Sequence, residues 1–273
     1  MGNYPAEELC WRSIMLKPRL IPCLLVQNQG LVKTVKFADP KYVGDPINAV
    51  RIFNEKMVDE LMVLDIDAAR LGREPDYRMI SNLANESRMP LSYGGGGRSA
   101  EQIERIIALG VEKVAVSSAA VANLELISQA AQRVGAQSIV VVVDVKKTGL
   151  LRRYEIVTHN ATHRTGIDPA DFIREAASHG AGEIVINTVD RDGTMVGYDL
   201  ELIEKLRSAT SLPMTVLGGA GSLEHVAALW KVQGMIGAAA GSMFVFKGKY
   251  RAVLINYPNP TEKARLLAAS GKF

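Results

Sequence analysis

The sequence predicts a (β/α)₈ barrel assembled from two (β/α)₄ halves. Apolar runs with strand character alternate eight times with helical patterns in about 250 residues, without a long linker or a break in composition. A glycine-rich segment at 89–97 (MPLSYGGGG) also occurs again in altered form at 212–221 (LPMTVLGGAG). An alternation of this length together with an internal repeat is typical of a closed barrel with two similar halves.

The repeat extends beyond the glycines. Pro90 and Pro213 are 123 residues apart, and the segment 60–67 lies over 183–190 at the same separation. A doubly wound sheet is the alternative fold, but it does not explain why the two halves match element for element.

The first half contains four predicted strand and helix pairs. Asp45 before Pro46 is an N-cap followed by proline at the first helical position, and Ser99 with Gln102 has the spacing of a capping box. The predicted strands are 20–26, 61–64, 91–93 and 114–116, with a further apolar segment at 31–37 that leads into a long connection, and the predicted helices are 47–57, 76–84, 99–109 and 120–134.

The second half begins with five β-branched residues, Ile139 to Val143, whose lack of alternation predicts a parallel strand buried on both faces. The segment 152–158 alternates and predicts a hairpin inserted in a loop. The remaining predicted strands are 183–188, 214–217 and 235–239, the predicted helices are 168–179, 199–208, 222–230 and 247–254, and a last helical turn or two is expected within 261–270. Residues 1–14 have no pattern and are expected to be an extension, with one barrel domain over 15–273.

The composition limits the class of protein. A chain of 273 residues with 48% hydrophobic and 22% charged residues can bury a full core. The net charge of +3 is spread along the chain, which predicts neither a nucleic-acid surface nor a membrane anchor. Cys10 and Cys23 are expected to be reduced, and no signal peptide or apolar run of about 18 residues occurs, so we expect a cytoplasmic protein.

Candidate site residues follow the predicted strands, because a barrel of this kind builds its site at the carboxyl ends of its strands. Glycines and small hydroxyl residues there suggest two phosphate cradles in opposite halves, so that a ligand with a phosphate at each end would span the barrel mouth. The alternative is that these glycines only form turns. The first cradle comprises Gly95, Gly96, Ser117 and Ser118, and the second comprises Gly193, Gly218, Gly219, Gly241 and Ser242.

Asp144 ends the most hydrophobic predicted strand, where an unpaired carboxylate is costly unless it faces a polar cavity. General acid or base chemistry is one interpretation, and pairing with Lys146 or Lys147 is the other. The repeat places Leu25 opposite Asp144, so the symmetric barrel offers no second carboxylate there. The four histidines lack metal-ligand spacing, with His159 and His163 expected in a loop, and no metal or cofactor is predicted.

Nine short motifs between residue 15 and about residue 256 resemble the HisF family, the cyclase subunit of imidazole glycerol phosphate synthase. These motifs are 21–24 (IPCL), 44–46 (GDP), 59–61 (DEL), 64–66 (LDI), 94–96 (GGG), 181–184 (AGEI), 190–194 (DRDGT), 197–199 (GYD) and 218–221 (GGAG).

The resemblance implies a barrel that receives ammonia from a glutaminase subunit at its bottom and performs ring-forming lyase chemistry on a bis-phosphorylated ribonucleotide with two aspartates at its top. Asp144 matches the second aspartate, whereas the first falls on Leu25. Lys33 matches a functional loop lysine, and either Lys33 or Asp192 could compensate for the missing carboxylate. The family's charged ammonia gate matches Arg19, Glu60, Lys113 and Glu183, for which an ordinary stabilising ion-pair network is the alternative.

An altered upper site above a retained gate resembles HisF paralogues found with surface-polysaccharide genes. The resemblance implies a HisH-like glutaminase, an ATP-dependent amidotransferase and a phosphorylated or nucleotide-linked sugar whose acetamido group becomes an acetamidino group. The alternatives are a true cyclase of histidine biosynthesis and a catalytically silent phosphate-binding scaffold.

Overall fold

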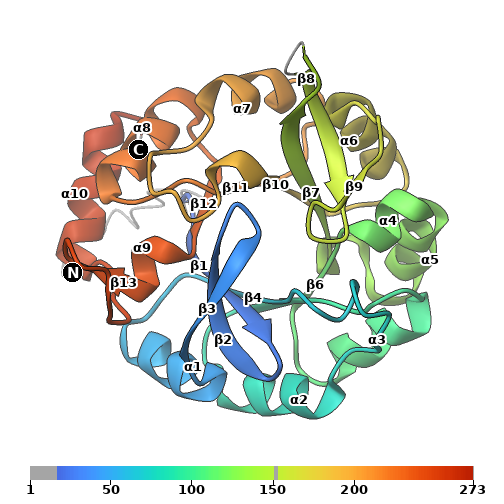
Figure 1. The fold of residues 1–273 in the computed structure, drawn as a ribbon, viewed down its shortest axis with the longest axis horizontal. Helices are drawn as coiled ribbons and strands as arrows, with labels where there is room; N and C mark the ends of the chain where they lie inside the picture. Colours follow the sequence, from blue (N-terminus) through green and yellow to red (C-terminus); the bar gives the residue numbers. More distant parts are fainter. Residues whose placement is uncertain (1–16, 151–152, 273) are drawn as a thin grey trace, which may run out of the picture.

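The computed structural model describes residues 17–150 and 153–272, and the predicted extension at 1–14 lies outside them. Eight parallel strands form one closed barrel, because β10 pairs with both β7 and β11 and β1 pairs with both β12 and β4. Helices form a ring around it (Figure 1). The strands are β1 (Leu20–Gln27), β4 (Leu61–Asp65), β5 (Leu91–Gly94), β6 (Lys113–Val116), β7 (Ile139–Thr148), β10 (Glu183–Thr188), β11 (Met214–Leu217) and β12 (Gly237–Ala240). The predicted fold is confirmed.

The helices begin at the capping residues that the sequence indicated. Asp45 accepts a hydrogen bond from the backbone N–H of Asn48 at 2.8 Å, and Asp168 accepts from that of Ala170 at 2.8 Å. The helices are α1 (Pro46–Glu55), α2 (Tyr77–Glu86), α3 (Ala100–Ala108), α4 (Ser118–Ala122), α5 (Glu125–Val134), α6 (Pro169–Ser178), α7 (Leu200–Arg207), α8 (Leu223–Gln233), α9 (Ser242–Val245) and α10 (Pro260–Ser270), with short 3₁₀ turns at Ala136–Ser138 and Val189–Arg191. None of the described helices is long and apolar enough to cross a membrane.

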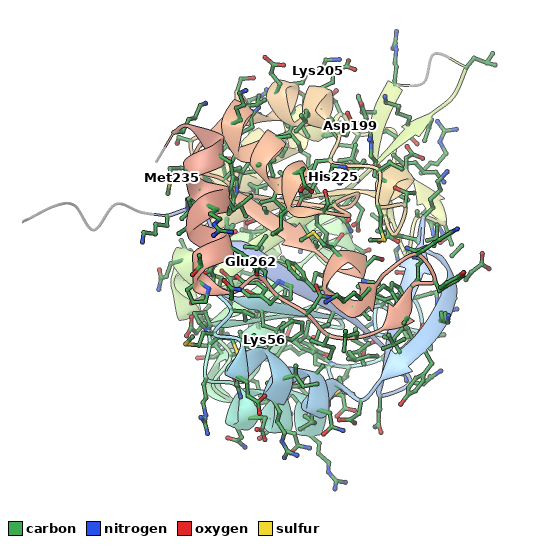
Figure 2. All side chains as sticks on the ribbon, turned by 90° about the vertical axis from the view of Figure 1, so that its left-hand side faces the viewer. Lys56, Asp199, Lys205, His225, Met235 and Glu262 are labelled. Atoms are coloured by element: carbon green, nitrogen blue, oxygen red, sulfur yellow. The ribbon has the colours of Figure 1, made fainter. Side chains whose placement is uncertain are left out.

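The prediction of a helix over 247–254 is wrong. This segment forms a hairpin of β13 (Phe246–Lys247) and β14 (Ala252–Val253), because Gly248 at φ +75° and Arg251 at φ +50° turn the chain back. The last helix is α10, which starts at a capping box of Asn259 and Glu262 and contacts α8. Glu262 and His225 mark these two helices in Figure 2.

Three other boundaries differ from the sequence prediction. The predicted helix over 120–134 is divided into α4 and α5, because Asn123 is extended and its side chain accepts from the N–H of Glu125 at 3.1 Å. The connection after the segment 31–37 contains a strand, β3 (Ala38–Gly44), paired with β2 (Gly30–Val35). Met235, expected in the last strand, is 44% exposed before β12 (Figure 2).

The hydrophobic core has two layers separated by the barrel wall. On β1, Leu20, Leu24 and Val26 pack toward the helices, whereas Ile21 and Cys23 belong to the cluster inside the barrel. Both faces of the strand are therefore apolar, which explains the absence of alternation in the sequence. The interior cluster consists of Ile21, Cys23, Leu25, Val32, Met62, Ala115, Val140, Val142, Val185, Leu217 and Ala239.

Two antiparallel insertions extend from the barrel mouth. One is formed by β7, β8 (Arg153–Thr158) and β9 (His163–Arg164), which confirms the predicted inserted hairpin over its described residues. The other is the β2–β3 hairpin on the β1–β4 side of the mouth (Figure 1). Asp192 holds this hairpin, because its carboxylate accepts from the Thr34 hydroxyl at 2.7 Å and its carbonyl accepts from the N–H of Lys36 at 2.9 Å.

Replacing Thr34 by valine should loosen the β2–β3 hairpin without unfolding the barrel. Loss of one hydrogen bond to a charged carboxylate is expected to speed amide hydrogen exchange in β2 and β3 by about tenfold. Thr210→Val, at the opposite end of the barrel, is the matched control. Unchanged exchange in the hairpin of Thr34→Val would contradict the assignment of Asp192 as its anchor.

Candidate functional site

A cavity of about 310 Å³ lies at the carboxyl ends of the barrel strands. Every residue predicted for the upper site lines it, although these residues come from both halves of the chain. They are Leu25, Lys33, Gly95, Gly96, Ser117, Ser118, Asp144, Asp192, Gly193, Gly218, Gly219, Gly241 and Ser242. The structure therefore brings the two predicted cradles and the carboxylates into one site.

Asp144 is held by two hydrogen bonds from neighbouring strands. Its Oδ2 accepts from the Ser117 hydroxyl at 3.0 Å and its Oδ1 accepts from the Asn187 Nδ2 amide at 2.8 Å. The pairing of β7 with β10 places Asn187 directly beside Asp144. Within the described residues, Asp144 forms no ion pair with Lys146 or Lys147, and Lys147 faces Asp199 at 3.9 Å instead. The alternative interpretation, in which Lys146 or Lys147 pairs with Asp144, is therefore wrong.

Burial raises the pKa of Asp144 to about 6. The hydrogen bonds from Ser117 and Asn187 oppose this rise because they stabilise the carboxylate, and the negative charge of Asp192 adds to it. A carboxyl group with a pKa near neutrality can both accept and release a proton at physiological pH. The geometry thus suits Asp144 for proton transfer.

Leu25 lies on the opposite side of the barrel from Asp144, since three strands lie between β1 and β7 in either direction. The side chain is 8% exposed and belongs to the apolar interior cluster, where Leu25 pairs in register with Val32 and Leu64. The cavity therefore has one wall with a carboxylate and an apolar wall facing it.

Lys33 reaches the cavity from β2 and is 5% exposed. A Cβ atom added to Gly241 would lie 1.9 Å from its Nζ, so glycine is required at this position for the ammonium group to lie against the Gly241–Ser242 turn. Ser242 has a buried hydroxyl without a hydrogen-bond partner among the described residues. The second predicted cradle thus contains a hydroxyl without a partner among the described residues, and the Lys33 ammonium lies against it.

The other glycines of the second cradle also pack tightly. Gly218 and Gly219 have φ values of +96° and +108°, and a Cβ on Gly219 would lie 2.2 Å from the carbonyl oxygen of Gly197. A Cβ on Gly193 would lie 2.1 Å from the carbonyl oxygen of Thr34. Close packing of turns explains these glycines without a ligand, and it also keeps the backbone open to the cavity.

The serines of the first cradle are already engaged within the protein. Ser117 donates to Asp144, and the Ser118 hydroxyl accepts from the N–H of His159 at 3.2 Å. A hydroxyl that accepts a hydrogen bond keeps its own O–H, so Ser118 can still donate to a phosphate oxygen, whereas the Ser117 O–H donates to Asp144. Gly95 has a φ of +130°, and a Cβ there would lie 2.7 Å from the carbonyl oxygen of Asp65.

Sequence reasoning missed several cavity residues, among them His159, Asn160 and Asn187. His159 lines the cavity from the predicted loop, and Asn160 donates from Nδ2 to the carbonyl of Ile66 at 2.8 Å. Asn187 could have been found, because Glu183, Val185 and Asn187 alternate along one face of β10. The contacts of His159 could not, because they depend on how the insertion folds back. The described residues contain no group of three or more His, Cys, Asp or Glu that could hold a metal ion.

Four charged residues at the strand starts form a closed ring at the opposite end of the barrel. Glu183 accepts from Arg19 Nη2 at 2.6 Å and pairs with Lys113 at 2.9 Å, while Glu60 accepts from Lys113 at 3.1 Å and also pairs with Arg19. The members of the predicted gate therefore contact one another directly.

The two glutamates of the ring are buried, whereas its two cations retain partial exposure. Side-chain exposure is 4% for Glu60 and 6% for Glu183, against 28% for Arg19 and 20% for Lys113. Burial alone would raise the pKa of Glu183, but Arg19 and Lys113 outweigh it and hold that pKa below its usual value. Glu183 thus stays ionised, and the ring lies at the end of the apolar barrel interior.

Comparison with known proteins shows sequence similarity along nearly the whole barrel. The family described as "Histidine biosynthesis protein" matches residues 19–251. A protein of Leptospira interrogans, provisionally named imidazole glycerol phosphate synthase subunit HisF, is 59% identical over 252 residues, which is 92% of this chain and 99% of that protein. This chain belongs to the HisF family.

Two further HisF-family relatives have comparable coverage. The Vibrio vulnificus protein provisionally named imidazole glycerol phosphate synthase subunit hisF3 is 54% identical over 93% of this chain and 97% of its own length. The Pseudomonas aeruginosa protein provisionally named subunit hisF2 is 47% identical over 90% of this chain and 97% of its own length. The family match over residues 19–251 includes both the charged ring and the cavity.

Replacing Asp144 by asparagine should stabilise the protein at pH 8 by about 2 kcal/mol and have little effect at pH 4. Because the pKa of Asp144 is raised to about 6, the folded protein keeps a proton that the unfolded chain loses near pH 4, so the wild type loses stability as the pH rises between these values. Urea unfolding at pH 4, 6 and 8 measures the difference. A gain that is larger at pH 4 than at pH 8 would show that burial does not disfavour this carboxylate.

Proposed function

We propose that this HisF-family chain is the synthase subunit of a glutamine amidotransferase complex. In this proposal it passes glutamine-derived ammonia through the barrel for conversion of an acetamido into an acetamidino group on a nucleotide-linked sugar of surface-polysaccharide (O-antigen type) biosynthesis. The observation that carries the proposal is the combination of a complete charged ring at one end with Asp144 facing the apolar Leu25, rather than a second carboxylate, at the other.

The charged ring is the proposed entrance for ammonia. A HisH-like glutaminase subunit would dock on this end, as the relatives' naming as subunits of imidazole glycerol phosphate synthase suggests. The two cations are better placed to move than the two glutamates, because Arg19 is 28% and Lys113 is 20% exposed whereas both glutamates are almost fully buried. Movement of Lys113 away from Glu60 and Glu183 would open a path, and its return would restore both ion pairs.

The barrel interior supports passage of neutral ammonia. Above the ring, the interior is lined by apolar side chains such as Ile21, Met62 and Val185, which cannot solvate an ammonium ion. The cavity reaches the upper part of this layer at Cys23, Val142 and Leu217. Ammonia that enters as a neutral molecule would therefore emerge beside Asp144.

The upper cavity is the proposed binding site for a phosphorylated or nucleotide-linked substrate. Lys33 supplies positive charge beside Gly241, and the Ser242 hydroxyl is free to donate to a phosphate oxygen. Asp192 would act mainly through the hairpin that carries Lys33, because its carboxylate already accepts from Thr34. An ATP-dependent amidotransferase would activate the acceptor, since no group in the cavity supplies that step.

The histidine-pathway cyclase is the second candidate function. It is favoured by Asp144, whose pKa of about 6 suits acid and base chemistry, and by a 42% identical Hyphomonas neptunium protein named imidazole glycerol phosphate synthase subunit HisF. Leucine cannot transfer a proton, however, and loss of one partner of an acid and base pair typically removes about 10²- to 10⁴-fold of rate.

Complementation separates these two functions. Expressed in a histidine auxotroph that lacks only the HisF cyclase, the chain is expected not to restore growth, because Leu25 leaves the ring closure without its second proton-transfer group. The control is the same host carrying an intact HisF cyclase, with expression of both proteins measured by immunoblot. Growth at the control rate would overturn the amidation proposal in favour of the cyclase.

Replacing Lys113 by methionine should reduce turnover with glutamine as the nitrogen source but not turnover with free ammonia. In the reconstituted complex, glutamine-dependent product formation is expected to fall at least about tenfold, because the ring loses two charge-assisted contacts, whereas turnover with added ammonium chloride should stay within about twofold.

Lys205→Met is the matched control, because it removes a lysine and glutamate pair on the exposed surface of α7 (Figure 2). Unchanged glutamine-dependent turnover in Lys113→Met, with the complex still assembled, would leave the ring as a stabilising network and favour the silent scaffold.

A further inference from the structure

Asn187 has one end of its side-chain amide unsatisfied. The residue is 5% exposed, its Nδ2 donates to Asp144 at 2.8 Å, and its Oδ1 has no hydrogen-bond partner among the described residues. An ionised carboxylate only accepts hydrogen bonds, so the amide nitrogen has to face Asp144 and the oxygen is left free. Buried polar atoms are rarely left without a partner, so this oxygen calls for a donor.

The surroundings of this oxygen restrict which donor can reach it. Asn187 and Asp144 line the cavity where it meets the apolar interior, together with Val142 and Leu217. Because the oxygen is buried, only a small group from the barrel interior or from the cavity can approach it. Asp144 accepts one bond on each oxygen, and an ionised carboxylate can accept about four, so it keeps acceptor capacity for the same group.

We propose that Asn187 Oδ1 and the Asp144 carboxylate together bind ammonia or ammonium, each accepting one N–H, at the top of the barrel interior. This inference rests on the proposed ammonia conduction. The pair supplies two acceptors in adjacent register on β7 and β10, which a nitrogen with several N–H groups can satisfy at once. Leu25, on the opposite wall, offers no proton and no competing hydrogen bond.

A substrate amide offers the same N–H chemistry, so the test includes both sources. The side-chain amide signal of Asn187 in the ¹⁵N-labelled full chain, assigned by its loss in Asn187→Ala, is followed at pH 7.5 during titration with ammonium chloride. A saturable shift is expected, with an apparent Kd at least about tenfold weaker in Asp144→Asn. Sodium chloride and tetramethylammonium chloride, which lack N–H groups, should give no such shift.

Absence of a saturable shift, or an equal shift with sodium chloride, would overturn the proposal. A shift with acetamide but not with ammonium chloride would overturn it in favour of a substrate amide.

Kinetics of the reconstituted complex provide a second test. Asn187→Ala is expected to raise the KM for ammonium about tenfold and to leave the KM for the acceptor within about twofold, because only the nitrogen loses an acceptor. Asn85→Ala, on the exposed face of α2, is the control. A fall in kcat at an unchanged ammonium KM would indicate a structural role and contradict the proposal. Absence of any glutamine-dependent product in the wild type would instead contradict the proposed function. The ammonium titration would still test binding at Asn187 and Asp144 independently.

Discussion

The pairing of β7 with β10 in the closed barrel governs both ends of the molecule. Six residue pairs in parallel register join the two strands, from Glu183 beside Val140 to Thr188 beside Val145. The same register carries Glu183 into the charged ring and Asn187 to the side of Asp144. A shift by one residue would turn Asp144 and Asn187 out of the barrel. Valine would then take the place of Asp144, and isoleucine or threonine the place of Asn187.

The closed barrel leaves an apolar interior with polar groups only at its ends. At the bottom, four charges are desolvated together, and each buried glutamate is compensated by both cations. At the top, Asp144 has no cation within ion-pair distance among the described residues and depends on two neutral donors, so its pKa rises. The charges at the lower end are therefore neutralised within the protein, whereas the carboxylate at the upper end remains available to a ligand.

The insertions bring chemistry to the mouth that the barrel strands do not carry. Lys33 reaches the cavity from β2 of the β2–β3 hairpin. A hydrogen bond from the Thr34 hydroxyl to Asp192, which follows β10 in the other half of the chain, holds this hairpin in place. His159 and Asn160 reach the same cavity from the insertion after β7. Left-handed φ values of 53°, 56° and 60° at residues 159–161 show that this loop depends on its contacts, since non-glycine residues adopt them at a cost.

Much of this architecture could be predicted because it depends on local chemistry. Apolar runs buried on both faces, capping residues such as Asp45 and Asp168, and the 123-residue repeat predicted the barrel and its order of elements. Asp144 and the glycines were also found, since they directly follow the apolar runs of the predicted strands. The same local reasoning failed at 247–254, where left-handed backbone overrides a helical composition, and at Asn123, whose side chain divides a helix.

The sequence by itself determined which residues end the strands and hence which can meet at the mouth or at the bottom. Only the tertiary structure decided how their hydrogen bonds are shared: Ser117 donates to Asp144, Ser118 accepts from His159, and Asn187 and Ser242 each have one polar atom without a partner among the described residues. The reason is physical. Strand ends follow from local patterns of burial, whereas a hydrogen-bond partner is set by distances across the closed barrel, which exist only once the first and last strands have met.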